Sequence, residues 1–211
     1  KEMIYLNADY ITSPLAKSFL AHEFIHLITF NQKDRIRGVA EETWLNEMRA
    51  EYASTLLGYD DVFTGSYLQN RVQIFSDNPF DSITEWNNAK ADYGAINLFV
   101  QYLVDHYGKE ILIDSLRSSK IGIDSINYAL QKKGFSVQPF KVGPDYIDPS
   151  YLSSISKREA FNLDVWLMGE NQVLESFVSN SKSYVSVIEG VMGYYDGFGG
   201  DSNYASTQHV A

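Results

Sequence analysis

The 211-residue chain predicts an α+β fold that is mostly helical, with a small sheet lobe beside one distinctive helix. The segment H-E-F-I-H at residues 22–26 lies in an apolar run that indicates a helix ending near Phe30. Several later segments repeat apolar residues at helical spacing. Residues 3–8 resemble a short strand, which we expect at the edge of the sheet lobe beside that helix.

Signals for the starts and ends of helices define the expected elements. Ser13 and Pro14 offer an N-cap and a first-turn proline to the first helix, and Gly58 suits the end of the second. The helices are expected at about 13–30, 41–57, 67–75, 93–107, 109–118, 123–133 and 157–170. The other segments are expected to be a polar loop at 31–38, an extended excursion at 135–156 and a β-like tail from 183.

Composition restricts the class of partner and the kind of site. The formal charge is -10, with 27 acidic and 17 basic residues, which disfavours a nucleic-acid backbone or an anionic membrane as a partner. The absence of cysteine excludes disulfides and Cys-type zinc sites, and no apolar run is long enough to predict membrane insertion. The chain begins at Lys1, which we interpret as a trimmed fragment, and its 15 tyrosines favour an extracellular or cell-surface bacterial protein.

Two histidines four residues apart project from one face of a helix. His22 and His26 are therefore expected to bind one metal ion, with Glu23 placed to act as general base on a metal-bound water. The alternative is an amphipathic helix with two half-exposed histidines. The next helix favours the metal, because Glu47 can complete a His₂Glu site and leave the fourth position to water.

Glu51 follows Glu47 by one helical turn and projects in nearly the same direction. A metal-bound histidine usually donates its other N–H to a carboxylate, so we expect Glu51 to orient His22. The alternative is a pair of solvated carboxylates, whose mild repulsion a cation would remove. These residues together predict one Zn²⁺ per chain, bound by His22, His26 and Glu47.

The pattern A-H-E-F-I-H-L-I followed by W-L-N-E-x-x-A-E-Y resembles the gluzincin zinc metallopeptidases, which include thermolysin. It is most similar to the hyicolysin-like secreted bacterial peptidases, over roughly residues 3–135. The resemblance implies a thermolysin-like catalytic core, with a zinc-binding lobe at residues 1–60. It also implies a mainly helical lower lobe at 61–211 with a loop-rich C-terminal tail.

The resemblance implies a zinc-dependent endopeptidase that cleaves peptide or protein substrates with a metal-activated water. Glu23 would take the water's proton, and Tyr93 is the expected oxyanion donor. Met48 stands where related aminopeptidases usually have glycine, which disfavours an exopeptidase. Two alternatives remain. One is a zinc-containing binding or structural module of a larger surface protein, and the other is a narrow self-processing peptidase.

Two pairs of acidic residues are candidate calcium ligands. Asp60 and Asp61 are adjacent, and Asp196 and Asp201 lie in a glycine-rich stretch. Neither pair has the oxygen-ligand spacing of a calcium-binding loop, so we interpret these residues as solvated turn carboxylates.

Overall fold

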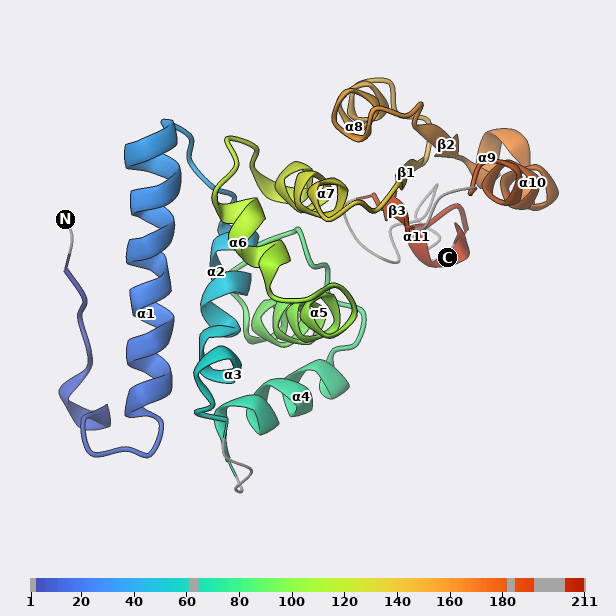
Figure 1. Ribbon diagram of the computed structural model, residues 1–211. Helices are drawn as coiled ribbons and strands as arrows, with labels where there is room; N and C mark the ends of the chain where they lie inside the picture. The colour runs from blue at the N-terminus through green and yellow to red at the C-terminus, as the bar shows by residue number, and fades with distance from the viewer. Residues whose placement is uncertain (1–2, 61–64, 182–184, 192–203, 211) are drawn as a thin grey trace. The chain divides into compact units, whose positions relative to one another are not determined.

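The computed structural model describes residues 3–60, 65–181, 185–191 and 204–210. The chain forms two compact units, Lys1–Ser125 and Ile126–Ala211 (Figure 1). The boundary lies within helix α7 (Gly122–Lys132), not near residue 60, where the sequence predicted it. Within the described residues, no helix is both long enough and apolar enough to cross a membrane.

The first unit is built of helices. In chain order these are η1 (Ala8–Tyr10), α1 (Ala16–Phe30), η2 (Asn31–Arg35), α2 (Thr43–Glu51), α3 (Ala53–Leu57), α4 (Tyr67–Asp77), α5 (Lys90–Tyr107) and α6 (Glu110–Leu116). Helix α1 lies against α2 and α3, while α5 contacts α2, α4 and α6 (Figure 1). The packing centre is the α2–α5 contact, where Leu45, Met48, Ile96 and Val100 are fully buried.

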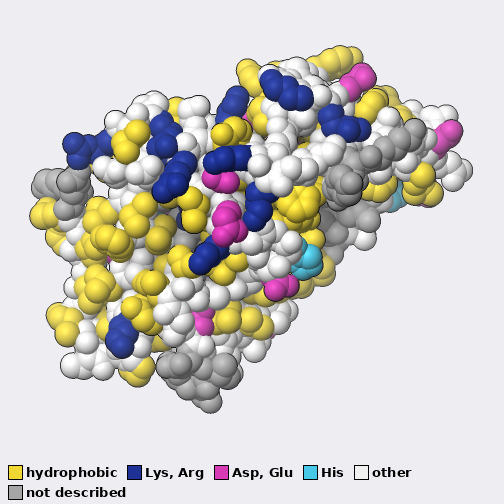
Figure 2. Space-filling view, viewed as in Figure 1, with side chains coloured by type: hydrophobic (Ala, Val, Ile, Leu, Met, Phe, Trp, Pro, Cys, Tyr) yellow, Lys and Arg dark blue, Asp and Glu magenta, His cyan; other side chains and the backbone are white. Residues whose placement is uncertain are grey.

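The strand predicted at residues 3–8 is wrong. Residues 3–7 have no regular structure, and Ala8–Tyr10 form a 3₁₀ turn. The Asn7 side chain accepts a hydrogen bond from the Asp9 backbone N–H, a local bond that favours a turn over a strand. Apolar side chains stay exposed over this segment and α1, as the left side of Figure 2 shows; they include Met3, Tyr5, Ile11, Leu20 and Phe24.

The predicted polar loop at 31–38 instead begins with the π-helical turn η2, and its lysine is buried. Lys33 Nζ donates to the carbonyls of Ser115 at 2.9 Å, Ser118 at 3.1 Å and Lys120. It also lies 3.3 Å from Glu41, which Arg49 contacts at 2.8 Å. Burial lowers the pKa of Lys33, and Glu41 opposes that change. The ammonium is buried because these acceptors replace its water.

Two of the predicted helices of this unit end as expected, and one is divided. Helix α1 ends at Phe30 and α5 ends before Gly108. The helix predicted at 41–57 is two helices, because α2 ends at Glu51 and α3 begins after Tyr52. Gly58, with φ of 70°, ends α3 in the left-handed conformation that glycine adopts easily.

The second unit contains a three-stranded parallel sheet. Its strands are β1 (Val137–Val142), β2 (Phe161–Leu163) and β3 (Val185–Glu189), in the order β2-β1-β3. Its helices are α8 (Asp148–Ser156), α9 (Val165–Met168), α10 (Glu170–Asn180) and α11 (Thr207–Val210). Parallel neighbours require crossover connections, which α8 supplies between β1 and β2 and α9 with α10 between β2 and β3. Phe140, Leu163, Val165 and Val173 form the core.

Two predictions for this unit are wrong. The excursion expected at 135–156 contains β1 and α8, and the helix expected at 157–170 is replaced by β2 and α9. Every residue of β1 is buried, so the strand lacks the alternation of apolar and polar residues that marks a half-exposed strand. Pro139 within it also favoured a loop. The β-like tail expected from 183 includes β3.

A carboxyl pair near the start of α5 makes stability depend on pH. Asp92 accepts hydrogen bonds from the backbone N–H groups of Asn87 and Ala89, both at 2.9 Å. Burial and a hydrogen bond to Asp92 raise the pKa of Asp81 to about 6. The protonated form therefore stabilises the fold at low pH, and that contribution is lost as pH rises through about 6.

We expect Asp81→Asn to be more stable than the parent chain by about 1 kcal/mol at pH 7.5, after allowance for solvent screening. The asparagine keeps a donor for Asp92 but carries no charge. At pH 4.5 the difference should shrink towards zero. Urea unfolding of both proteins at the two pH values measures it, and a difference independent of pH would contradict the assignment.

Candidate functional site

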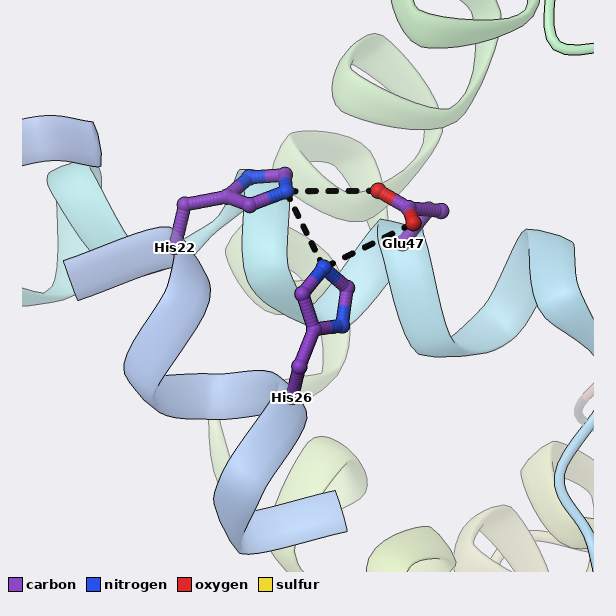
Figure 3. A group of neighbouring side chains, drawn as sticks. All are labelled: His22, His26 and Glu47. Carbon is purple, nitrogen blue, oxygen red and sulfur yellow. Dashed lines mark hydrogen bonds and ion pairs between the residues drawn. The ribbon is translucent and has the colours of Figure 1, made fainter. Parts of the chain in front are cut away.

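Three side chains from α1 and α2 converge on one point (Figure 3). His22 and His26 lie one turn apart on α1, and their Nε2 atoms are 3.2 Å apart. Glu47 on α2 places Oε2 at 3.3 Å from His22 Nε2 and Oε1 at 3.5 Å from His26 Nε2. Among the described residues, these three form the one group of His, Cys, Asp or Glu that meets a metal-site spacing.

The donor atoms lie close enough together to surround one ion. Ligands bound at about 2.0–2.1 Å to a tetrahedral ion lie about 3.3 Å from one another. The two Nε2 atoms are 3.2 Å apart, and each lies 3.3 or 3.5 Å from a different oxygen of Glu47. With one atom taken from each residue, all three lie within 4.8 Å of one another. Glu47 Oε2 is buried and makes no hydrogen bond. The structure brings these three residues together, and their role as metal ligands stays a prediction.

The outer nitrogens of both histidines face acceptors. His26 Nδ1 lies 3.1 Å from Asn46 Oδ1. His22 Nδ1 lies 3.4 Å from Glu51 Oε1 and 3.3 Å from the Tyr67 hydroxyl. A proton on each Nδ1 satisfies these acceptors and leaves both Nε2 lone pairs directed at the shared point. Glu51 lies where the sequence predicted it, against His22.

Glu51 is fully buried and accepts from several donors. Arg71 contacts it through Nε at 2.6 Å and Nη2 at 2.9 Å, and Asn97 Nδ2 lies at 3.2 Å. The Tyr67 hydroxyl donates to the same carboxylate. Burial favours a raised pKa for Glu51, but hydrogen bonds from His22 and Arg71 outweigh it and hold the pKa below its usual value.

Sequence reasoning missed Asn46, Tyr67, Arg71 and Asn97. Asn46 had a signal, since it directly precedes Glu47 on the same helix. Tyr67 and Arg71 are one helical turn apart on α4, which is an ordinary spacing for an exposed helix face. Nothing in that spacing connects them to Glu51, because the contact is tertiary.

The two predicted catalytic residues lie outside the group of three donors. Glu23 is partly buried on α1 beside His22. The Tyr93 hydroxyl contacts Asn88 Oδ1 at 3.4 Å, and its ring packs on the Arg71 guanidinium, 4.8 Å from the ring centre. Burial, with Glu47 and Glu51 nearby, raises the pKa of Tyr93 to about 12. Tyr93 therefore belongs to the surroundings of Arg71.

Three of the four acidic residues considered as candidate calcium ligands lie outside the described residues. Asp61, Asp196 and Asp201 are not among the residues that the structure describes. Asp60 accepts a hydrogen bond from the Thr55 hydroxyl, and burial raises its pKa.

A second polar site lies at the carboxyl ends of the parallel strands in the second unit. Lys141, Asn162 and Glu189 are in register across the three strands, so their side chains share one face of the sheet. Lys141 Nζ contacts the Gly190 carbonyl at 2.8 Å, Asp148 at 3.2 Å and Glu189 at 3.8 Å. Ligands of parallel α/β sheets typically bind at this edge.

The loop after β1 is held in one conformation. Asn162 Nδ2 donates to the carbonyls of Gly143 at 2.6 Å and Asp145 at 2.9 Å. The Asp145 carboxylate accepts from the backbone N–H groups of Ile147 at 2.7 Å and Asp148 at 3.2 Å. Tyr146 is left 92% exposed at the tip. Sequence reasoning missed this site because residues 135–156 were expected to be an extended excursion.

No family model and no solved structure matches the chain, so the predicted gluzincin architecture remains a prediction. Three similar proteins are named cobyrinate a,c-diamide synthase. The Clostridium tetani protein is 57% identical over 83 residues, covering 39% of this chain and 18% of that protein. The Fusobacterium nucleatum protein is 46% identical over 94 residues, which cover 44% of this chain and 21% of that protein. The Listeria innocua protein is 50% identical over 88 residues, which cover 41% of this chain and 20% of that protein.

The chain thus spans about a fifth of the length of these curated relatives. Because the relatives are synthases, the resemblance to gluzincins was misleading. The zinc-dependent endopeptidase function, the metalloprotease class and the secreted-peptidase assignment inferred from it are wrong. The physical reason is that H-E-x-x-H fixes only three positions, and their spacing describes metal-binding geometry rather than a reaction.

The electrostatics of the histidine pair can be tested without a metal. Burial lowers the pKa of His22, but Glu47 and Glu51 raise it more, to about 9 from an ordinary 6.5. We expect an NMR titration of the metal-free chain to give this value, and Glu47→Gln to return it towards 6.5. Asp105→Asn is the control, because that carboxylate lies 3.9 Å from His106 instead. A His22 pKa near 6.5 in the parent chain would contradict the geometry.

Proposed function

We propose that the second unit of this chain is a part of a cobyrinate a,c-diamide synthase. The proposal is carried by the stretch that is 57% identical to the Clostridium tetani synthase. That stretch is 83 to 94 residues long in the three relatives described, close to the length of the second unit. The second unit also has the parallel sheet whose carboxyl edge suits a ligand site.

We assign substrate recognition to the polar edge of the sheet. The product named in the relatives carries two amides, at positions a and c, so the site must accept carboxylates of cobyrinate. Lys141 is buried in the row of side chains at this edge and paired with Asp148 and Glu189, so it orders the edge rather than binding those carboxylates itself. The loop closed by Asn162 presents an exposed Tyr146 beside it. We assign substrate positioning to this loop.

The test is a chimera in which residues 126–211 replace the matching segment of the Clostridium tetani synthase. Supplied with ATP and an amide-nitrogen donor, the chimera should form cobyrinate a,c-diamide from cobyrinate, measured by separation of the product. In the chimera, Asn162→Asp should lower kcat/KM by about tenfold or more, because it removes both N–H bonds that order the loop.

Asn171→Asp is the matched control, since Asn171 is exposed on α10 and should leave the rate unchanged. A chimera that folds, as judged by circular dichroism, but forms no product would contradict the proposal.

A separate proposal concerns the first unit, which we propose binds one zinc ion through His22, His26 and Glu47. The observation that favours it is that the two Nε2 atoms and the Glu47 carboxylate lie close enough together to share one ion. The Asn46 and Glu51 contacts add to it, because they leave both Nε2 atoms free to bind. A zinc ion with three protein ligands keeps one position for water and can act there as a Lewis acid.

Elemental analysis of the chain purified without chelator should find one zinc per chain. Glu47→Ala should lower zinc retention sharply, because two ligands remain, whereas Glu85→Ala on an exposed loop should not. Zinc must displace the proton of His22, so affinity should rise by up to about tenfold per pH unit between pH 7 and 9. Absence of zinc, with none taken up from solution, would exclude the site.

A further inference from the structure

We infer that Arg71 is a positioning residue for the zinc site proposed above: it holds the Glu51 carboxylate in the one orientation that directs His22 Nε2 at the metal. The inference rests on that proposed site. Arg71 touches neither histidine in the contacts described, so its effect would pass through Glu51. Nothing in the H-E-x-x-H segment or in the second helix points to it.

The Arg71–Glu51 contact is a two-point fork. Nε meets Oε2 at 2.6 Å, and Nη2 meets Oε1 at 2.9 Å. Such a pair sets the plane of the carboxylate as well as its distance, which a point charge does not do. Oε1 is thereby turned towards His22 Nδ1, 3.4 Å away. Asn97 holds the opposite oxygen from α5, so the carboxylate has little freedom to rotate.

Arg71 is itself held on both faces. Its guanidinium carbon lies 4.9 Å from the centre of the Tyr67 ring and 4.8 Å from that of Tyr93. Tyr67 is on α4 and Tyr93 on α5, so two helices determine where the guanidinium sits. Stacking on aromatic rings is a property of the planar guanidinium that an ammonium reproduces poorly.

Charge and orientation predict opposite effects of removing Arg71. As a nearby positive charge, Arg71 repels a zinc ion, so its removal would strengthen zinc binding if charge alone mattered. As a positioning residue it favours the binding geometry, so its removal would weaken zinc binding. Arg71→Lys separates the two effects, because it keeps the charge and loses the fork.

The experiment measures zinc affinity of the full chain by competition with a chromogenic chelator. We expect Arg71→Lys and Arg71→Met each to weaken zinc binding by roughly tenfold, the lower end of the effect of residues that orient metal ligands. Arg37→Lys is the control, since Arg37 binds the Arg117 carbonyl and Gln32. Unchanged affinity in Arg71→Lys, or tighter binding in Arg71→Met, would overturn the inference.

Two further readouts keep the result interpretable. The absorption spectrum of the Co²⁺-substituted chain should change shape in Arg71→Lys, which a variant that only lowers stability would not cause.

If the parent chain binds no zinc, the zinc proposal fails separately. The inference is then judged by ¹⁵N NMR of the metal-free chain at pH 10, where the parent should carry the His22 proton on Nδ1 and Arg71→Lys should populate both tautomers. A single tautomer in both proteins would overturn it.

Discussion

The first unit depends on one buried carboxylate. Glu51 is completely inaccessible, yet it is charged, because α4 supplies Arg71 and Tyr67, α5 supplies Asn97 and α1 supplies His22. A buried charge is tolerated only when such donors surround it. Removing the carboxylate would leave these donors buried and without their partner. The carboxylate therefore constrains how three helices approach α2. The orientation of the histidine pair follows from the same constraint.

The second unit solves a different problem. A central parallel strand must be covered on both faces, so β1 is buried throughout and the crossover helices are obligatory. The polar residues that remain are collected where the strands end. The in-register row of Lys141, Asn162 and Glu189 places them side by side although they are far apart in sequence.

Local signals in the sequence predicted much of the first unit. The apolar period and Gly58 located α1 and the end of α3, because both depend on neighbouring residues. The pairing of Glu51 with His22 followed from helical spacing.

Arg71 could not be found in this way, since its partner lies 20 residues earlier and meets it only through packing. The strand β1 was missed because full burial removes the alternation that identifies strands. Function was misjudged because the three fixed positions of the motif describe how an ion is held, and that geometry is compatible with more than one chemistry.

The burial of Lys33 limits how short a folded fragment of this chain can be. Its ammonium is enclosed by carbonyls of residues 115, 118 and 120, which lie far along the sequence. A piece cut at residue 60 would keep both histidines and Glu47 but would remove the three carbonyls that accept hydrogen bonds from this ammonium. The turn after the histidine helix would then keep the ion pair with Glu41 but lose the carbonyls that fix the Lys33 ammonium. A piece that keeps every acceptor of Lys33 beside the histidine pair must therefore extend through residue 120, about twice the length of the lobe suggested by the motif alone.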